Sequence, residues 1–261
     1  RPMIPSWIAA VFYAVFGLCV GSFLNVVIAR LPAGRSIAYP GSACPGCGTA
    51  IHWYDNIPVL SYVALGGRCR ACRATISWRY PFVELMCGAL FAAAYLRFGS
   101  GTQLLAALVL LSTLVAITGI DVDHQIIPDV LSLPGIALGL LVSLAPGGIG
   151  WKDSVLGTLL GGGVFIVIIV ASGIVLGQPG MGIGDVKLGA MLGAFLGWKL
   201  VLLSILLSVL IGGPLAATLL ATGRKGRKDP LPFGPFLAVG AVISLFCGEA
   251  VLAWYFAQFA V

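Results

Sequence analysis

Charged residues are scarce in this chain of 261 residues. Asp, Glu, Lys and Arg together make up 9% of it, whereas a soluble globular domain carries about 25%. Hydrophobic residues make up 59%, and the mean hydropathy is +1.06. So few charges cannot cover a surface that faces water. The composition therefore excludes an ordinary soluble domain and indicates a protein whose solvent is mostly lipid.

Other features are also missing. No glycine-rich loop stands between a strand and a helix, as it would in a dinucleotide-binding fold. No cleavable signal peptide is expected, because the first apolar run is too long for one and lacks a basic segment before it. The chain has only two histidines. One of them, His124, stands beside acidic residues in a loop, and we assign it no catalytic role.

Long apolar runs dominate the rest. A membrane span needs roughly 20 apolar residues, and the runs predict an all-α polytopic membrane protein with about eight transmembrane helices. The expected spans are residues 7–29, 80–96, 103–120, 130–144, 154–176, 186–197, 200–222 and 236–256. The sixth is short, with Gly189, Gly193 and Gly197 at four-residue spacing. Small residues at that spacing let helices approach closely, so we expect this span to be buried among its neighbours.

The spans divide the chain into three parts: a first transmembrane helix (1–29), a polar segment (30–79) and a transmembrane core (80–261). Spans alternate sides, so the polar segment shares a side with the basic run Arg224, Lys225, Arg227 and Lys228. Eleven Lys and Arg fall on that side and four on the other. The excess of positive charge predicts that the first side is cytoplasmic and that both ends face out. The basic run itself either sets this topology or contacts lipid headgroups or a substrate leader.

Four cysteines stand in the polar segment, in two C-x2-C pairs separated by 21 residues: Cys44, Cys47, Cys69 and Cys72. This spacing is typical of a structural zinc site, in which each pair offers two thiolates to one ion. The alternative is two disulfides, which the reducing cytoplasm disfavours. A segment with few aliphatic side chains makes a poor core, so the metal would serve folding.

Acidic residues gather near the ends of two apolar runs. Three of the nine acids, Asp121, Asp123 and Asp129, fall in one nine-residue stretch, and Asp185 ends the sequence Gly182-Ile-Gly184-Asp185. Ionisable groups at membrane depth are costly and suggest function. By the predicted topology, Asp121 and Asp185 both lie at the cytoplasmic rim, within reach of one cavity.

Two adjacent carboxylates share one proton, so that one acts as a base on water and the other as an acid toward a carbonyl. This is the chemistry of aspartyl proteases, with Asp121 and Asp185 as the pair. Gly182 and Gly184 would let a backbone pass close to Asp185. The positive end of the helix dipole at a helix start favours the charged form of Asp185. Asp121 would then be the protonated member, although coupled groups titrate as a pair.

Alternatives remain for each acid. Asp129 follows Pro128 and precedes a helix, so it is interpreted as an N-cap. Asp123 is either solvated or an outer partner of the pair, and Asp185 alone could serve as a cap. A proton-coupled transporter would use the same carboxylates and glycine-broken helices, and it is the main rival function.

At these residues the chain closely resembles the prepilin peptidase family, which comprises type IV leader peptidases and N-methyltransferases. The matching stretches are GSFLNVVIARLP (21–32), CPGC (44–47), IHWYDNIP (51–58), SY (61–62), CRAC (69–72), RYPFVEL (79–85), DVDHQIIPD (121–129), MGIGDVKL (181–188) and PFGPF (232–236). Members often carry an acidic residue where Pro179 stands here, which leaves the aspartate pair intact.

The resemblance implies a bacterial inner-membrane enzyme that cuts the basic leader from type IV prepilins or type II secretion pseudopilins at the cytoplasmic face. The family's catalytic aspartates match Asp121 and Asp185, and Asp123, Asp129 and Lys187 lie in the same motifs as supporting residues. The expected partners are this substrate and membrane lipid, with no nucleic acid.

The resemblance also implies methylation of the new N-terminal amine by S-adenosylmethionine, with the four-cysteine segment involved. Gly66 and Gly67 would permit close approach of this cofactor, or they form a plain turn beside the metal site. Glu84 near the cytoplasmic end of the second span binds a cationic group, such as the amine or a sulfonium, or pairs with Arg79.

Overall fold

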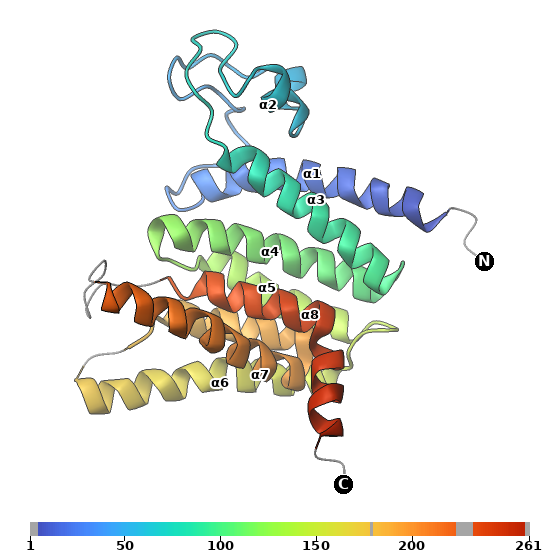
Figure 1. Cartoon of the computed structure of the whole chain (residues 1–261), viewed down its shortest axis with the longest axis vertical. Helices are drawn as coiled ribbons and strands as arrows, with labels where there is room; N and C mark the ends of the chain where they lie inside the picture. Colours follow the sequence, from blue (N-terminus) through green and yellow to red (C-terminus); the bar gives the residue numbers. More distant parts are fainter. Residues whose placement is uncertain (1–4, 178–179, 223–231, 259–261) are drawn as a thin grey trace. The chain divides into compact units, whose positions relative to one another are not determined.

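The computed structural model describes residues 5–177, 180–222 and 232–258, and the long elements in them are all helices (Figure 1). Six of these helices are long and apolar enough to cross a membrane. The chain divides into two compact units, Arg1–Ser100 and Gly101–Val261, which are described separately. The basic run at Arg224, Lys225, Arg227 and Lys228 and the unusual Pro179 lie outside the described residues.

The first unit is built on two paired helices, α1 (Ser6–Arg30) and α3 (Arg79–Phe98). Glycines bring them together: a Cβ added to Gly17 would lie 2.5 Å from the carbonyl oxygen of Cys87, and one on Gly21 would lie 2.7 Å from Cα of Glu84. Only small residues allow such contact between helices. The rings of Tyr13 and Tyr95 stack across the pair, with centroids 4.9 Å apart.

A compact segment connects these two helices. It contains a short 3-10 helix, η1 (Trp53–Asn56), and a short helix, α2 (Leu60–Ala64). Arg70 donates three hydrogen bonds of 2.6 to 3.2 Å to the carboxylate of Asp55. These bonds hold the pKa of Asp55 below its usual value, and they tie η1 to the turn that carries the second cysteine pair.

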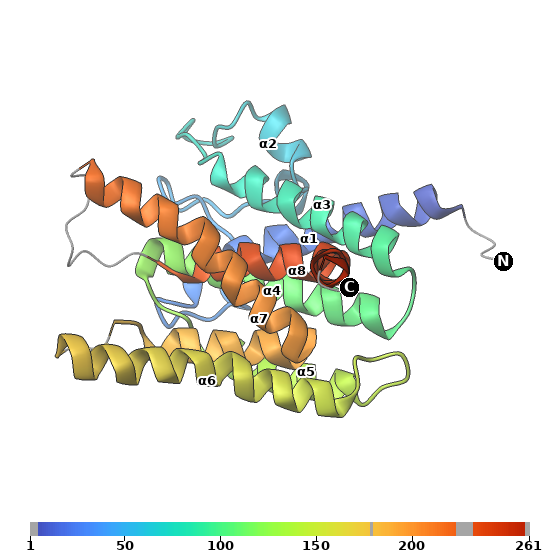
Figure 2. The ribbon, with the colours of Figure 1, turned by 60° about the horizontal axis from the view of Figure 1, so that its bottom comes forward.

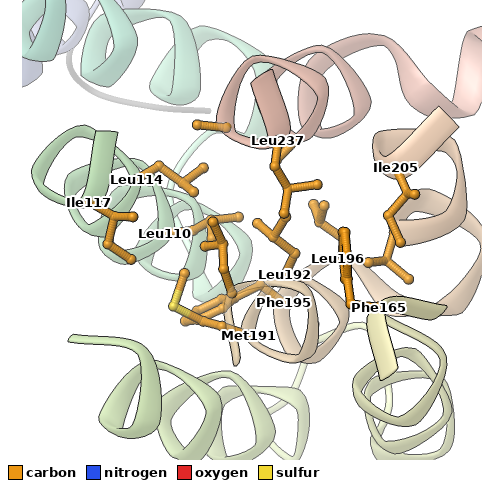
Figure 3. Close-up of a cluster of buried hydrophobic side chains, with 14 residues drawn as sticks. Leu110, Leu114, Ile117, Phe165, Met191, Leu192, Phe195, Leu196, Ile205 and Leu237 are labelled. Carbon is orange, nitrogen blue, oxygen red and sulfur yellow. The ribbon is translucent and has the colours of Figure 1, made fainter. Parts of the chain in front are cut away.

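The second unit contains α4 (Thr102–His124), α5 (Asp129–Ser143), α6 (Trp151–Leu176), α7 (Ile183–Ala221) and α8 (Gly234–Ala257). Helix α7 packs against α5, α6 and α8, and Figure 2 shows α6 running alongside the first part of α7. Its side chains fill the middle of a hydrophobic core, which Figure 3 shows with contributions from α4, α6, α7 and α8, including Leu114, Phe165, Leu192 and Leu237.

Helix α7 turns back on itself at Gly197, where the backbone leaves helical geometry (φ 76°, ψ 173°). A Cβ added to Gly161 of α6 would clash with the carbonyl of Gly189 and lie 3.0 Å from Val201 Cγ2. Gly189 and Val201 are twelve residues apart, which corresponds to about 18 Å in an unbroken helix. Both can lie against Gly161 only if the chain reverses between them. If α7 is counted as two helices, one on each side of Gly197, the long helices of the described residues correspond to the eight predicted segments.

The predicted burial of the sixth segment is confirmed. Gly189, Gly193 and Gly197 are all buried, and added Cβ atoms on the first two would clash with the backbone of Gly161 and Gly157 in α6. The hydroxyl of Ser154 donates a 2.7 Å hydrogen bond across this interface to the carbonyl of Ala194. The predicted span 130–144 corresponds to α5, whose 15 residues fall short of a full crossing.

Candidate active site

Asp121 lies in the last turn of α4 and is 5% exposed. Its Oδ2 accepts a buried 2.9 Å hydrogen bond from the backbone N–H of Gly234, the first residue of α8. Helix α4 ends just after it, because Gln125 adopts a left-handed conformation (φ 56°) and donates its N–H to the Asp121 carbonyl at 2.9 Å. The end of α4 thus presents this carboxylate to the beginning of α8.

Asp185 lies in the first turn of α7, which begins at Ile183 after Gly182. Its Oδ2 accepts a 3.3 Å hydrogen bond from the N–H of Gly182, and its own N–H donates to the Gly182 carbonyl at 3.2 Å. An acidic side chain three residues into a helix often closes the helix start in this way. Asp185 is therefore not the N-cap itself, but its carboxylate helps to close the helix start.

The fold brings the segments that carry these two carboxylates together. Asp121 is at the carboxyl end of α4 and Asp185 at the amino end of α7, and the loop that follows α4 packs through Ile127 against Gly184, the neighbour of Asp185. Each carboxylate accepts a hydrogen bond from a glycine N–H at a helix start. Hydrogen bonding thus does not distinguish the two carboxylates.

Asp129 and Lys187 form an ion pair beside this site. The Lys187 ammonium lies 2.6 Å from Oδ1 of Asp129, so it joins the start of α5 to the start of α7. The interpretation of Asp129 as an N-cap is wrong. Helix α5 starts one residue earlier than expected, because the carbonyl of Pro128 already accepts the N–H of Ser132, and the Asp129 carboxylate instead pairs with lysine.

The glycines before Asp185 have different surroundings. A Cβ on Gly184 would lie 3.0 Å from Cβ of Ile127, so this glycine allows the loop between α4 and α5 to pack against the start of α7. Gly182 is exposed, and the nearest side-chain atom to an added Cβ is Oδ2 of Asp185 at 3.8 Å. Asp123 and His124 have exposed side chains at the end of α4.

Gly234 is the residue of this site that sequence reasoning missed. Pro235 follows it, and proline in the first turn signals a helix start, so the beginning of α8 was readable in the sequence. Its partner Asp121, 113 residues earlier, was not. A Cβ on Gly234 would lie 2.6 Å from Oδ2 of Asp121, so the contact requires glycine.

The four cysteines of the first unit form one cluster, with all their sulfur atoms within 4.8 Å of one another. The sulfur atoms of Cys44 and Cys72 are 3.7 Å apart, and the cysteines are free. A disulfide would need about 2.0 Å. Four thiolates at about 2.3 Å from one tetrahedral ion would lie about 3.8 Å apart, so the cluster fits a single metal ion and not two disulfides.

The two cysteine pairs sit in matching turns. Antiparallel bridges between Ala43 and Ala50 and between Arg68 and Thr75 flank them. Gly48 and Arg73 both adopt left-handed conformations four residues after the first cysteine of each pair. A hydrogen bond with the Thr49 side chain is the main cause that lowers the pKa of Cys47 to about 6, which favours the thiolate that binds metals.

The residues associated with methylation lie in the same unit. Gly66 and Gly67 both have positive φ and form the turn between α2 and the second cysteine pair, with Gly67 accepting the N–H of Ile76 at 2.7 Å. Glu84 is buried, and its Oε2 accepts a 2.8 Å hydrogen bond from the N–H of Val59. The two glycines therefore lie in a turn, and close approach of a cofactor to them stays a prediction.

Two family models match the chain: the Bacterial Peptidase A24 N-terminal domain over residues 15–98, and the Type IV leader peptidase family over residues 108–217. Curated relatives are named prepilin leader peptidase/N-methyltransferase. One from Stutzerimonas stutzeri is 40% identical over 94% of this chain and 93% of its own length. One from Aeromonas hydrophila is 38% identical, with 97% and 96% covered.

A third relative, from Myxococcus xanthus, is 47% identical over 70% of this chain, and the match covers 55% of that protein's length. No solved structure matches the chain.

Proposed function

The chain belongs to the type IV leader peptidase family, and on that premise we propose that it is a membrane aspartyl endopeptidase with Asp121 and Asp185 as its catalytic pair. Its substrates are the leader peptides of type IV prepilins or type II secretion pseudopilins, cut at the cytoplasmic membrane face. Methylation of the new N-terminus follows.

The arrangement around Asp121 and Asp185 carries this proposal. They lie on different helices, but the loop that follows α4 packs against the start of α7, and Asp121 is buried against the start of α8. Burying an acidic group between membrane helices is costly, so such a group is usually kept because a function requires it. Family membership makes proteolysis, rather than transport, the function for which this pair is kept.

The reaction needs one carboxylate as a base and the other as an acid. The base takes a proton from a water molecule, which attacks the scissile carbonyl, and the acid donates a proton to the carbonyl oxygen. The N–H groups of Gly234 and Gly182 each occupy one oxygen of a carboxylate and fix its orientation. Within the described part of the chain no hydrogen bond reaches the other oxygen of either carboxylate, which leaves that oxygen for water or the substrate.

Charge supports the proposed orientation. Eleven of the fifteen Lys and Arg fall on the side of the four-cysteine segment by the alternation of spans, and this side faces the cytoplasm under the positive-inside rule. A substrate with a basic head and an apolar helix would place its scissile bond at the membrane rim. In the division proposed from the sequence, 80–261 is the peptidase core and 30–79 the cytoplasmic segment.

We further propose that Cys44, Cys47, Cys69 and Cys72 bind one zinc ion with a structural role. Four thiolates without an open position make a closed site. The ion would stabilise the connection between α1 and α3, which has few buried apolar side chains of its own. When bound, zinc supplies stability to this segment rather than reactivity.

The decisive experiment compares Asp121→Ala and Asp185→Ala with the wild-type protein on a synthetic prepilin. Each substitution is expected to abolish leader cleavage while the protein still inserts into the membrane, because neither carboxylate can do the work of both. Full cleavage by either single variant would refute the catalytic pair. Adding S-adenosylmethionine and measuring product mass tests methylation in the same assay.

A further inference from the structure

A cavity of about 370 Å³ lies within the first unit, between α1 and the segment that follows it. This volume falls in the range of about 300 to 1,000 Å³ typical of small-molecule sites. One face of α1 supplies its wall through residues spaced three or four apart, and residues near Ala38 and Pro58 complete it. None of the residues proposed for the peptidase reaction lines this cavity.

Arg30 stands at one end of the α1 wall. Its guanidinium donates to the carbonyl oxygens of Ser36, Pro40 and Gly41 at 2.7 to 3.1 Å. These bonds employ three of the five N–H hydrogens of an arginine, and all three acceptors are neutral. These bonds hold the guanidinium in place at the cavity. Because the three carbonyls carry no net charge, they do not neutralise the guanidinium, and it can bind a carboxylate.

Glu84 stands behind another part of the wall. Its backbone packs against Gly21, the neighbour of the lining residue Ser22, and its carboxylate accepts the N–H of Val59, next to the lining residue Pro58. Val59 has a left-handed backbone (φ 60°) that a β-branched residue rarely adopts. Glu84 therefore holds this part of the wall in a costly conformation and places a buried acidic group beside the cavity.

Arg30 thus lines one end of the cavity, and Glu84, which does not line it, lies behind the wall near Ser22 and Pro58. Ser22 and Arg30 are eight positions apart on α1, which corresponds to about 12 Å. A ligand that matches this arrangement is elongated, with a carboxylate at one end and positive charge further along, and has an apolar or aromatic part that can contact Phe23 and Val26. S-adenosylmethionine has a carboxylate, an ammonium, a sulfonium and an adenine ring.

We propose that this cavity is the binding site for the methyl donor S-adenosylmethionine, with Arg30 binding its carboxylate and the Ser22–Glu84 wall facing its cationic part. This inference rests on the proposed methyltransferase function and moves its site away from Gly66 and Gly67. The transfer forms a bond between the amine nitrogen and the methyl carbon. The carbon–sulfur bond breaks with its electron pair left on sulfur, and the amine loses one proton to water.

The test uses the purified full chain with its metal. Ala38 is exposed and lines the cavity, so Ala38→Trp extends an indole into it with little effect on folding. Ala33 is exposed in the same loop but does not line the cavity, which makes Ala33→Trp the matched control. Binding of tritiated S-adenosylmethionine, cleavage of a synthetic prepilin and methylation of the product are measured for each.

Ala38→Trp is expected to raise the Kd for S-adenosylmethionine at least tenfold and to lower methylation, with metal content and leader cleavage unchanged. Ala33→Trp is expected to match the wild type. Wild-type binding by Ala38→Trp overturns the site, and so does loss of cleavage with binding retained, which would assign the cavity to the peptide. A wild-type protein that does not cleave prepilin would instead refute the proposed function itself.

A measurement on the wild type makes the test independent of any variant. Ultraviolet cross-linking of tritiated S-adenosylmethionine, followed by peptide mapping, is expected to label residues 19–30 or 37–58. Label confined to residues 101–261 overturns the proposal.

Discussion

Replacing Gly234 with alanine tests the geometry of the proposed active site without touching either aspartate. Gly234 donates its N–H to Oδ2 of Asp121 at 2.9 Å, and an added Cβ would lie 2.6 Å from the same oxygen. An ordinary contact begins at 3.4 Å, so the carboxylate or the start of α8 must shift by about 0.8 Å. The substitution therefore moves a proposed catalytic oxygen while its chemistry stays unchanged.

Misplacement of a reacting group by about 1 Å costs roughly 100-fold in rate. For Gly234→Ala we expect kcat for leader cleavage to fall by about that factor, or about 2.7 kcal/mol in activation free energy. KM is expected to change little, because Gly234 positions Asp121 and is not proposed to contact the substrate. The kinetics are measured on a synthetic prepilin in detergent, with thermal unfolding of the same samples to confirm folding.

Gly163→Ala is the matched control. Gly163 lies within α6, where an added Cβ meets nothing within 4 Å. Alanine is favoured over glycine in a helix by about 1 kcal/mol, so this variant is expected to retain wild-type kcat and equal or higher stability. If Gly234→Ala cleaved prepilin at the wild-type rate, the contact between Asp121 and α8 would have no part in the active geometry.

Three further outcomes are expected. Chelation or Cys44→Ser should remove one zinc per chain and unfold the four-cysteine segment, as metal analysis and proteolysis would detect; zinc-free protein with oxidised cysteines contradicts this. Lys187→Met and Asp129→Asn should show a coupling of at most about 1 kcal/mol in a double-mutant cycle of thermal unfolding, because the pair is partly exposed, and should slow cleavage only several-fold; complete loss would assign the pair a catalytic part. Arg73→Gly should strengthen zinc retention against a chelator by about 1 kcal/mol, because Arg73 has φ 60° where Gly48 has φ 72° in the matching turn; weaker retention would contradict the strain.

The helices and the four-cysteine cluster were largely predictable because their signals are local. Apolar runs marked each span to within a few residues, since lipid requires about 20 apolar residues for a crossing. The C-x2-C spacing of Cys44 and Cys47 marked a turn that the structure shows. Glycines at four-residue spacing marked the buried face of the segment that begins at Ile183, because contact between helices depends on small side chains.

Contacts between distant residues were not predictable. The sequence placed Asp121 and Asp185 at the ends of two apolar runs, but not the N–H of Gly234 against the first of them. It left Asp129 as a cap, whereas packing of α5 against α7 gave it Lys187 as a partner. It also left open whether Glu84 pairs with a cation, and the fold placed the N–H of Val59 against it.

The sequence alone determined that this chain is a polytopic membrane protein, where its helices lie to within a few residues, and that four of its cysteines fall in two matching turns. Composition, periodicity and spacing act over a few residues, and each leaves a local trace. Only the tertiary structure decided that α7 reverses at Gly197 and that α8 begins against Asp121, because both depend on how helices far apart in the sequence pack. It also decided that α1 and the segment after it line one open cavity.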